Sequence, residues 1–521
     1  MCVYDRLPEP PSPTDETVWN DFAKFYLIGL GGRGQTALDK FGVWKDIEQV
    51  CTAVVGRRDW APGSTEGVER IFEGRKFQTQ VLPRDKLVSA LYKHIQDNYV
   101  DQIELNYGYE IRPLDFANNG GQSVLVEVSK CSGETEADLT CETDSVVRIA
   151  TELLIAADGT ARTIANAMEK EDKDRRKTMN PIHRLFAGKP FTVRRYSDDS
   201  PRVYKTIPMK LPPGWRPDLN YSARSRGGRM NLDALPANRN GDYCAVLLLR
   251  KGDEMAEPDV DPIIFRKFLD DLLPQFSAIL SEELVEQVAK KPPSFLPSFR
   301  YVGPRLNQGD RTIVLGDCAH TVKPYFGLGA NSALEDVKVL SDAIDSTNSL
   351  TEAVHKFSRQ RAKESELLVK ISRSLDRPGN MGKITFVVPI ILDSIFNKIA
   401  PKVFAPNIIT MLQREDLTFK QVAFRKRWDR FFQLTIIGGI LTALTTGTSF
   451  VISSIARALG MRNSTLTLMF ALGATSALIL RKAMRFMVPG MAPADVLAKA
   501  NSKITAKESI TRIEESTSSN R

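Results

Sequence analysis

The sequence contains few of the residues from which metal centres and disulfide frameworks are built. Its 521 residues include six cysteines and four histidines, and no two cysteines stand at CxxC spacing. We therefore expect no metal site, free thiols and a reducing compartment. The amino terminus, MCVYDRLPEPPSP, lacks both the apolar core of a signal peptide and the arginine-rich pattern of a transit peptide, so it shows no targeting address.

The sequence also has no excess of acidic over basic residues. Lysine and arginine number 71 against 63 aspartates and glutamates, which gives a formal net charge of +8. The basic residues lie beside apolar segments and are not interleaved with aromatic residues, which favours a membrane surface over nucleic acid as a partner. A hydrophobic fraction of 42% with 26% charged residues is typical of globular proteins and excludes a disordered or fibrous chain.

Two uncharged apolar runs near the carboxyl terminus, 431–456 and 463–480, are each long enough to cross a membrane as a helix. Basic residues precede the first run and follow the second, so the positive-inside rule predicts a hairpin with both ends on the cytoplasmic or equivalent face. Burial in soluble protein, and a single span with an interfacial second segment, remain open. The preceding segment ITFVVPIILDSIFNKIAP is interrupted by Asp393 and Lys398, and we expect it to cover a pocket or to lie on the membrane surface.

The remaining chain has an α/β pattern with an interruption. Short β-branched runs alternate with helical segments up to about residue 164, and separated strands with proline-rich and glycine-rich turns follow between 181 and 297. The α/β pattern returns at RTIVLGDCAHTVKPYFGLGAN. We interpret this as one α/β domain into which a sheet-based domain is inserted. Beyond residue 350 the chain is mostly helical.

Three glycines, Gly29, Gly31 and Gly34, stand at the GxGxxG spacing of a dinucleotide-binding turn. The next strand, CTAVVGRRDW, ends without the acidic residue that would hold a ribose, and arginines stand there instead. Two interpretations therefore remain open. One is an NADP site with Arg57 or Arg58 on the 2′-phosphate, and the other is a glycine-rich turn before an ordinary helix.

The stretch VLGDCAHTVKPYFGLGAN has the most specific pattern. A strand delivers Asp317 at its carboxyl end, where the carboxylate can accept hydrogen bonds from a polyol. A loop through Pro324 and Gly327 then opens a helix whose first amides can face an electron-rich ring edge. This stretch resembles the GDAAHxxxPxxGQGxN motif of class A flavoprotein aromatic hydroxylases, with Leu328 in place of the glutamine. In that family the aspartate holds the FAD ribityl chain and the helix start faces the isoalloxazine.

A second motif supports the resemblance. In LLIAADGTARTIANAM, Asp158 and Gly159 resemble the family's DG motif, which is linked to FAD and NADPH, and Ala165 stands where the family has an arginine. Within the family the chain is most similar to the kynurenine 3-monooxygenases, through GLGGRGQTALDKFGV and VLPRDKLVSALYKHI. There the segment at 29–34 follows the second strand, which places MCVYDR at the end of that strand. The resemblance predicts that a first strand with its own GxGxxG precedes Met1.

The resemblance also implies a set of site residues. Arg58 lies where the kynurenine 3-monooxygenases have an arginine that pairs with the substrate carboxylate. Phe72 and Phe419 replace two tyrosines, and no counterpart of a substrate-binding asparagine is found near 374–376, so we expect an aromatic substrate that carries a carboxylate or is more apolar. The residues predicted to shape the catalytic face are Pro324, Phe326 and Gly327. The predicted cofactor contacts are Asp5, Gly29, Arg33, Arg84, Asp158, Gly159, Asp317, Gly327, Gly329, Ala330 and Asn331.

The implied fold is α/β, with a glutathione-reductase-like FAD-binding domain (1–170 and 301–350), an inserted β-rich substrate domain (181–300), a helical region (351–430), membrane-anchor helices (431–485) and a polar tail (486–521). The implied activity is NADPH-consuming, FAD-dependent hydroxylation of a small aromatic substrate with O2 through a flavin C4a-hydroperoxide. The resemblance places it on an organelle membrane such as the mitochondrial outer membrane. Two alternatives remain open: a membrane-anchored flavoprotein-like scaffold with impaired catalysis, and an NADP-binding Rossmann reductase.

Overall fold

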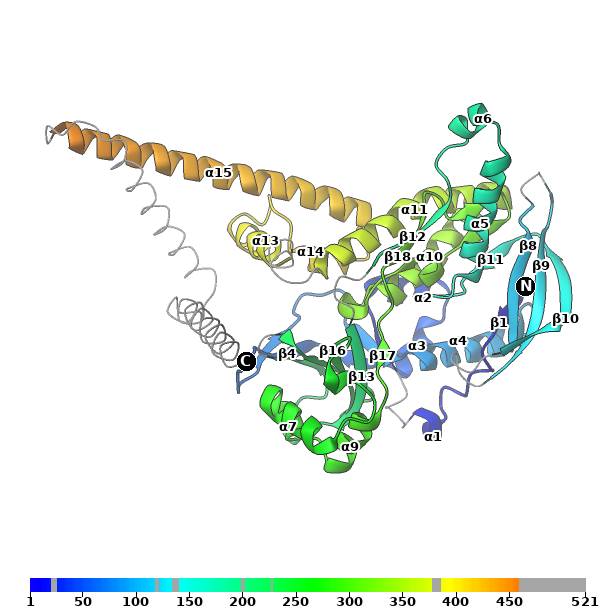
Figure 1. Cartoon of the computed structure of the whole chain (residues 1–521), viewed down its shortest axis with the longest axis horizontal. Helices are drawn as coiled ribbons and strands as arrows, with labels where there is room; N and C mark the ends of the chain where they lie inside the picture. The colour runs from blue at the N-terminus through cyan, green and yellow to red at the C-terminus, as the bar shows by residue number, and fades with distance from the viewer. Residues whose placement is uncertain are drawn as a thin grey trace, which may run out of the picture. The chain divides into compact units, whose positions relative to one another are not determined.

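The computed structural model describes residues 1–19, 26–117, 121–133, 140–197, 202–225, 228–376 and 386–458. This part of the chain forms two compact units (Figure 1). Unit 1 comprises Met1–Val388 and Pro406–Arg425, and unit 2 comprises Pro389–Ala405 and the residues from Lys426 onward. The order of strands and helices confirms the predicted α/β fold with a mostly helical region after residue 350.

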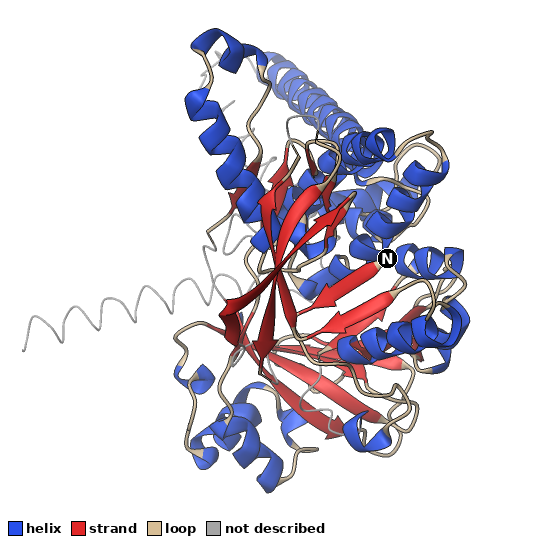
Figure 2. Ribbon diagram, turned by 90° about the vertical axis from the view of Figure 1, so that its right-hand side faces the viewer, coloured by secondary structure: helices blue, strands red, loops and turns tan. Residues whose placement is uncertain are grey.

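A seven-stranded sheet carries the largest apolar core of unit 1. The strands lie in the order β17-β13-β16-β15-β14-β4-β5, and their bounds are β4 (Gly56–Trp60), β5 (Val68–Ile71), β13 (Arg202–Lys210), β14 (Leu219–Arg224), β15 (Asn231–Pro236), β16 (Asp242–Arg250) and β17 (Ser294–Phe295). Strands β4 and β5 thus join the sheet from a segment well before residue 181. Because side chains alternate along a strand, residues such as Tyr221 and Leu247 share one face. They pack against α7 (Pro262–Leu272), α8 (Pro274–Ser277) and α9 (Glu282–Lys290) (Figure 2).

Two pairs of parallel strands form the α/β part. Strand β1 (Cys2–Asp5) pairs with β7 (Glu104–Tyr107), and β11 (Leu154–Ala156) pairs with β20 (Thr312–Val314), which also pairs with β19 (Asn307–Gln308). The β11–β20 pair joins segments that lie on either side of the predicted insertion. Helices α5 (Thr163–Thr178), α10 (Gly329–Asp345) and α11 (Leu350–Leu375) contribute to the core around this pair. Since parallel strands end on the same edge of a sheet, the motifs that follow β11 and β20 meet there.

The glycine-rich segment lies in an antiparallel sheet. Strands β2 (Leu27–Leu30) and β3 (Thr52–Val54) both pair antiparallel with β6 (Thr79–Pro83), and α2 (Gly32–Lys40) and α3 (Trp44–Gln49) connect β2 to β3. A dinucleotide-binding turn requires a parallel βαβ unit. The NADP-binding Rossmann interpretation of these glycines is therefore wrong, and they form a turn into α2.

The prediction of free thiols is also wrong for one pair of cysteines. Strands β8 (Tyr109–Asp115), β9 (Val124–Ser132) and β10 (Thr140–Thr151) form an antiparallel sheet in which Cys131 lies opposite Cys141, and a disulfide joins them. The spacing of the cysteines alone does not give the register that makes them neighbours. The remaining elements of unit 1 are β12 (Thr192–Arg195), β18 (Arg300–Gly303), β21 (His320–Thr321), α1 (Glu16–Trp19), α4 (Arg84–Asn98), α6 (Pro181–Phe186) and α14 (Ile408–Leu412).

Unit 2 is built from α13 (Val388–Ile399) and the greater part of α15 (Phe419–Ala458). Among the described residues, one helical segment, Phe419–Val451, is long and apolar enough to cross a membrane. This finding confirms the prediction of a helix of spanning length over the first apolar run. The second run, 463–480, and the polar tail lie outside the described residues.

Candidate active site

A buried arginine joins the two motif turns at the edge where β11 and β20 end. Arg162 is 1% exposed, and its φ of +55° lies in the left-handed region. Its guanidinium donates hydrogen bonds to the carbonyl oxygens of Cys318 (3.0 Å) and Asp317 and to the hydroxyl of Thr321. The sequence prediction missed this residue. The available signal was the DG motif itself, in which Arg162 stands three residues before the alanine that replaces the family's arginine.

The carboxylate of Asp317 has no hydrogen-bond donor among the described residues. Burial raises the pKa of this carboxyl group, although the positive charges of His320, Arg162 and Arg84 oppose that rise. Asp317 is only partly buried, so its carboxylate can be reached by a ligand that supplies donors. The polyol chain of a ribityl group supplies hydroxyl donors, so Asp317 fits its predicted role.

Asn331 explains why the two glycine-rich segments meet. Its side-chain oxygen accepts hydrogen bonds from the amides of Gly31 (2.8 Å) and Gly34 (3.2 Å), and its amide nitrogen donates to the carbonyl oxygens of Gly29 (2.8 Å) and Gly327 (2.6 Å). A Cβ on Gly34 would lie 2.5 Å from that side-chain oxygen, so only glycine fits there. Asn331 therefore holds the turn before α2 against the turn before α10 and is a positioning residue, which corrects its predicted role as a cofactor ligand.

The turn before α10 remains open for a ligand. Gly327 is exposed and has a φ of +62°, a conformation that favours glycine, and Pro324 and Phe326 before it are only partly buried. Helix α10 begins at Gly329 without a side-chain cap. The first amides of such a helix have no intrahelical acceptor, so those of Gly329 and Ala330 can donate to an electron-rich ring edge.

A buried charged cluster lies behind this turn. The carboxylate of Asp336 accepts from the amide of Gly316 (2.8 Å) and from Arg361 (2.7 Å), and His320 Nε2 lies 2.8 Å from it. Burial would raise the pKa of Asp336, but Arg361 and His320 outweigh it and hold that pKa well below its usual value. The cluster fixes the GDC turn to α10 and α11.

Arg33 is held in place by contacts within the protein. It is 4% exposed, its guanidinium lies 2.6 Å from a carboxylate oxygen of Glu335, and it donates to the carbonyl oxygens of Leu412 and Leu417. The ring of Phe419 lies 4.5 Å from the guanidinium carbon. Phe419 is fully buried by this contact and is therefore part of the core. The roles of Arg33 at the cofactor and of Phe419 at the substrate therefore stay predictions, and the structure shows both side chains engaged in packing.

Four other predicted cofactor contacts lie at or near the ends of strands or helices. Asp158 accepts a hydrogen bond from the amide of Ile164 (3.0 Å) in the first turn of α5, and Gly159 has a φ of +60°. Asp5 is exposed at the end of β1 and accepts from the amide of Leu7 (2.9 Å). Arg84 begins α4 with an exposed side chain, and its charge opposes the rise in the pKa of Asp317. Asp5 and Arg84 are open to solvent, whereas Asp158 and Gly159 are partly buried.

Two neighbouring arginines of β4 lie on opposite faces of the seven-stranded sheet. Arg58 lies on the helix-covered face of the seven-stranded sheet, where its guanidinium carbon is 4.9 Å from the ring of Trp60 and 5.6 Å from that of Trp215. Arg57 lies on the opposite face. There Cys244 packs with residues of β2, β3 and β6, the sheet whose Gly29 is bonded to Asn331. The assignment of Arg58 to the substrate stays a prediction, and Arg57 is a second candidate on the other face of the sheet.

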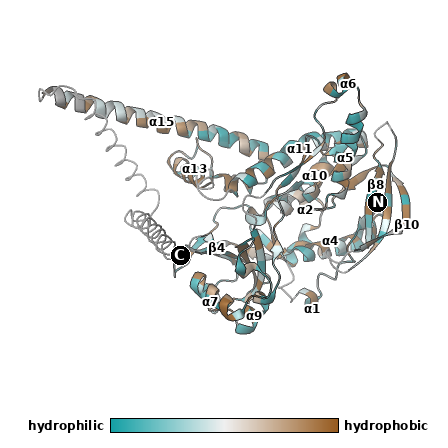
Figure 3. Cartoon of the chain, in the orientation of Figure 1, coloured by the Kyte–Doolittle hydropathy of each residue, from teal (hydrophilic) through white to brown (hydrophobic). Residues whose placement is uncertain are grey.

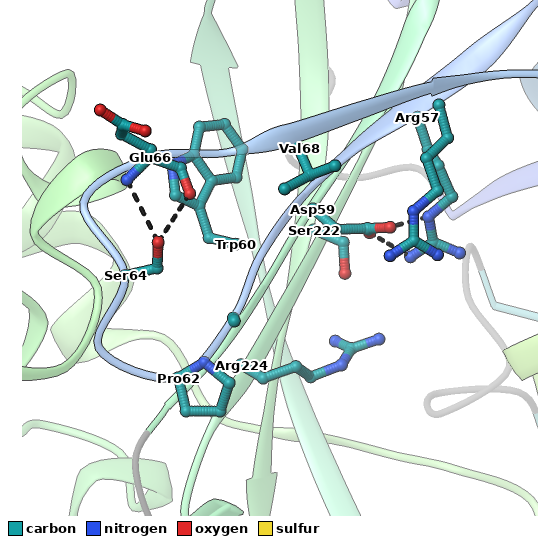
Figure 4. A pocket seen from close by; sticks show the side chains of 11 residues that line it. Arg57, Asp59, Trp60, Pro62, Ser64, Glu66, Val68, Ser222 and Arg224 are labelled. Atoms are coloured by element: carbon teal, nitrogen blue, oxygen red, sulfur yellow. Dashed lines mark hydrogen bonds and ion pairs between the residues drawn. The ribbon is translucent and has the colours of Figure 1, made fainter. Parts of the chain in front are cut away.

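Arg57 lines a pocket of about 320 Å³ (Figure 4). Its Nε donates to Asp59 (2.7 Å), and Ser222 and Arg224 line the same pocket and bond to Asp233. Arg70 stands directly opposite Arg57 in the β4–β5 pairing. The carboxylate of Asp59, paired with Arg57, offsets the repulsion between these two like charges. The predicted substrate residue Phe72 does not line this pocket, and its ring lies 4.0 Å from the guanidinium carbon of Arg75.

An ion pair beside the catalytic turn was not predicted. Lys323, immediately before Pro324, is 3% exposed, and its ammonium lies 2.6 Å from a carboxylate oxygen of Asp376. Asp376 stands at the end of α11, in the segment where no asparagine counterpart was found. The pair links the end of α11 to the turn that carries Pro324 and Gly327.

Solved structures share this fold. The oxygenase of 2-methyl-3-hydroxypyridine-5-carboxylic acid aligns with a TM-score of 0.50 and 14% identity, covering 73% of this chain and 88% of that one. HpxO of Klebsiella pneumoniae, solved with FAD and uric acid, aligns with a TM-score of 0.50 and 18% identity, covering 79% and 89%. The fold is thus that of the FAD-binding monooxygenases. No protein-family model matches the chain.

Curated relatives narrow this class. The chain is 22% identical over 462 residues to a kynurenine 3-monooxygenase of Salinispora tropica, which covers 86% of this chain and 90% of that enzyme. It is 26% identical over 189 residues to the kynurenine 3-monooxygenase of Candida albicans, covering 35% and 41%. With the fold, these relatives support the predicted class, an FAD-dependent monooxygenase of the aromatic hydroxylase type.

Proposed function

We propose that this protein is an FAD-dependent, NADPH-consuming monooxygenase that hydroxylates a small aromatic substrate bearing a carboxylate, and that α15 anchors it in a membrane. One observation carries the proposal. The unsatisfied carboxylate of Asp317, the open turn at Gly327 and the uncapped start of α10 meet at the edge where β11 and β20 end. The relatives named kynurenine 3-monooxygenase support the same activity.

The residues present fit FAD. Asp317 would accept hydrogen bonds from the ribityl hydroxyls, the amides of Gly329 and Ala330 would face the ring edge, and Asp5 and Arg84 would contact the ribose and phosphate portion. FAD bound here would take reducing equivalents from NADPH and activate O2 for transfer of one oxygen atom. Pro324 and Phe326 would cover the reacting face and exclude water from it.

Arg57 is assigned to the substrate. Its guanidinium lies in a pocket that also contains Arg70, and an aromatic carboxylate there would gain charge-assisted hydrogen bonds, in competition with Asp59 for Arg57. Trp60, Pro62 and Val68 line another part of the pocket, where the apolar ring of the substrate would lie. The carboxylate would therefore fix which ring carbon is presented for hydroxylation.

Membrane attachment follows from the composition of α15. Most of its apolar run beyond Gln433 is exposed in the described structure, and basic residues precede it. The positive-inside rule places the catalytic unit on the cytoplasmic or equivalent face. The likeness to kynurenine 3-monooxygenases favours an organelle membrane, with the mitochondrial outer membrane as the specific proposal.

Retention of FAD tests the proposal. Full-length protein purified in detergent is expected to carry stoichiometric, non-covalent FAD, and Asp317→Ala is expected to weaken FAD binding by about 10–100-fold because a charged acceptor is lost. Asp310→Ala is the matched control, since Asp310 is exposed in the same segment and pairs only with the exposed His355. Wild-type protein without FAD, or without NADPH oxidation stimulated by any aromatic carboxylate, would favour the non-catalytic scaffold instead.

A further inference from the structure

The contact between α13 and α15 in unit 2 has an inside-out distribution of side chains, although Phe404 beyond α13 is buried against Phe396. Asp393 and Gln433 are fully buried, and Lys426 and Asp429 are buried nearly as deeply. In the described part of α13, Asp393 is the one buried residue, whereas Ile399 at the end of that helix is 75% exposed. On α15 the exposed side chains include Trp428, Phe431, Phe432 and Leu434. Water-soluble proteins show the reverse distribution.

The buried polar groups form a closed, electrically neutral cluster. Asp393 lies 3.2 Å from Lys426 and 3.2 Å from Arg430, and Gln433 donates to it at 3.2 Å. Lys426 also lies 3.0 Å from Asp429. Two carboxylates and two cations therefore cancel, and positions 426, 429, 430 and 433 form one stripe on α15 that faces α13.

Such a cluster gives little net stability in water compared with an apolar core of similar volume. In a lipid environment the balance changes, because acyl chains offer no hydrogen bonds and polar side chains must find partners inside the protein. Exposed apolar side chains then contact lipid acyl chains, which are apolar as well. Figure 3 shows the hydrophobic residues of α13 in brown.

We infer that α13, together with the part of α15 that packs against it, contacts the bilayer. In this arrangement α13 lies in the membrane interface and is held to α15 through Asp393. This inference rests on the proposed anchoring by α15. Exposed cations at Lys398, Lys402 and Arg427 border the apolar surface and match the anionic headgroups of a lipid leaflet. The rings of Trp428 and Phe432 are stacked 5.7 Å apart, and Phe431 lies beside them, which is the aromatic belt expected at headgroup level.

Lipid-specific quenching tests this inference. In a Cys2→Ser background, which removes the exposed free thiol, an environment-sensitive fluorophore is attached to Ile399→Cys, and separately to Val403→Cys in case one substitution disturbs the helix. The matched control is Ile263→Cys on α7 of unit 1, where the side chain is 81% exposed. The full-length proteins are reconstituted into phosphatidylcholine–phosphatidylglycerol vesicles with or without quencher-labelled acyl chains. Retained FAD reports that each variant folds.

The expected result is that both unit 2 probes lose about half of their fluorescence to acyl-chain quenchers, as a helix buried in the headgroup boundary requires, while the control probe is unchanged. Vesicle flotation separates the two levels of the proposal. If the protein floats with the vesicles but neither unit 2 probe is quenched, anchoring by α15 stands and the interfacial role of α13 is overturned. The interfacial role is also overturned if a second copy of the chain covers these probes. If the protein does not float, both proposals fail.

Discussion

The two units of this chain differ in what lies at their helix contacts. Unit 1 encloses a large core of aromatic and aliphatic residues such as Tyr221, Leu247 and Phe265, whereas the contact between α13 and α15 in unit 2 encloses Asp393 and Gln433 and leaves Trp428, Phe431 and Phe432 exposed. The interior of unit 1 is typical of a protein in water, where burial of apolar side chains drives folding. The contact between α13 and α15 suits lipid, where polar groups must form hydrogen bonds within the protein. The difference teaches that the burial pattern, more than the length of one apolar helix, identifies the part of a protein that meets the membrane.

The largest expected effect compares two phenylalanines, one from each unit. Phe265→Ala should lower the free energy of unfolding of unit 1 by about 3–5 kcal/mol, because its ring is completely buried under the sheet. Phe431→Ala should change it by less than about 0.5 kcal/mol, because that ring is exposed. Thermal unfolding followed by circular dichroism in detergent measures both values. Equal destabilisation by the two variants would break the comparison.

Two aspartate variants on α10 test whether burial also decides how much stability a substitution removes within unit 1. Asp336→Asn should destabilise the protein by about 3 kcal/mol, because it leaves Arg361 and His320 buried without their carboxylate. Asp342→Asn on the same helix is the control, since Asp342 is half exposed and its pairing with Lys40 should contribute less than about 1 kcal/mol. The measurement is the same unfolding assay. A small effect of Asp336→Asn would mean that the cluster does not hold the GDC turn.

Variants of the two adjacent arginines of β4 compare a side chain that lines a pocket with one that packs on aromatic rings. Arg57→Gln should raise the KM for a carboxylate substrate by about 10–100-fold while leaving the melting temperature unchanged, because Arg57 lies in the open pocket. Arg58→Gln should lower the melting temperature and leave the KM unchanged, because Arg58 packs on Trp60 and Trp215. Steady-state NADPH oxidation gives the KM values. The opposite result would identify Arg58 as the substrate residue.

The smallest effect is a pH dependence from a buried acid of unit 1. Burial raises the pKa of Asp172, but hydrogen bonds from Arg175, Arg176 and Arg305 outweigh it and lower the pKa to about 2. Because this is below the ordinary value of 3.8, the contribution to stability is complete at neutral pH and is lost as the pH falls from 3.8 towards 2. Melting temperatures over this range should fall less steeply for Asp172→Asn than for wild type, and parallel curves would contradict the assignment.

The sequence predicted the chemistry of the site better than its geometry. Asp317, Gly327 and the start of α10 were identified because a strand, a glycine turn and a helix leave a local pattern. The meeting of that turn with the 29–34 segment depends on Asn331, which lies about three hundred residues away in the chain from its partners Gly31 and Gly34. No local pattern reports such a contact.

Three features of the structure depend on contacts that a single sequence does not reveal. Arg57 and Arg58 are chemically identical, and only the register of β4 in its sheet decides which one faces the pocket, since a shift by one residue exchanges the faces. Cys131 and Cys141 likewise became partners through the register of β9 and β10. Arg33 seemed available for a cofactor until the fold supplied Glu335 and Phe419, both distant in sequence.

The most direct test of the central claim is the fate of molecular oxygen. FAD-loaded, full-length protein is incubated with NADPH, isotopically labelled O2 and a panel of aromatic carboxylates, and the products are analysed by mass spectrometry. The account predicts that, for at least one of them, a single labelled oxygen atom appears on the aromatic ring and that Arg57→Gln reduces this labelling. Consumption of NADPH that yields only labelled hydrogen peroxide, with every aromatic carboxylate in the panel, would contradict it.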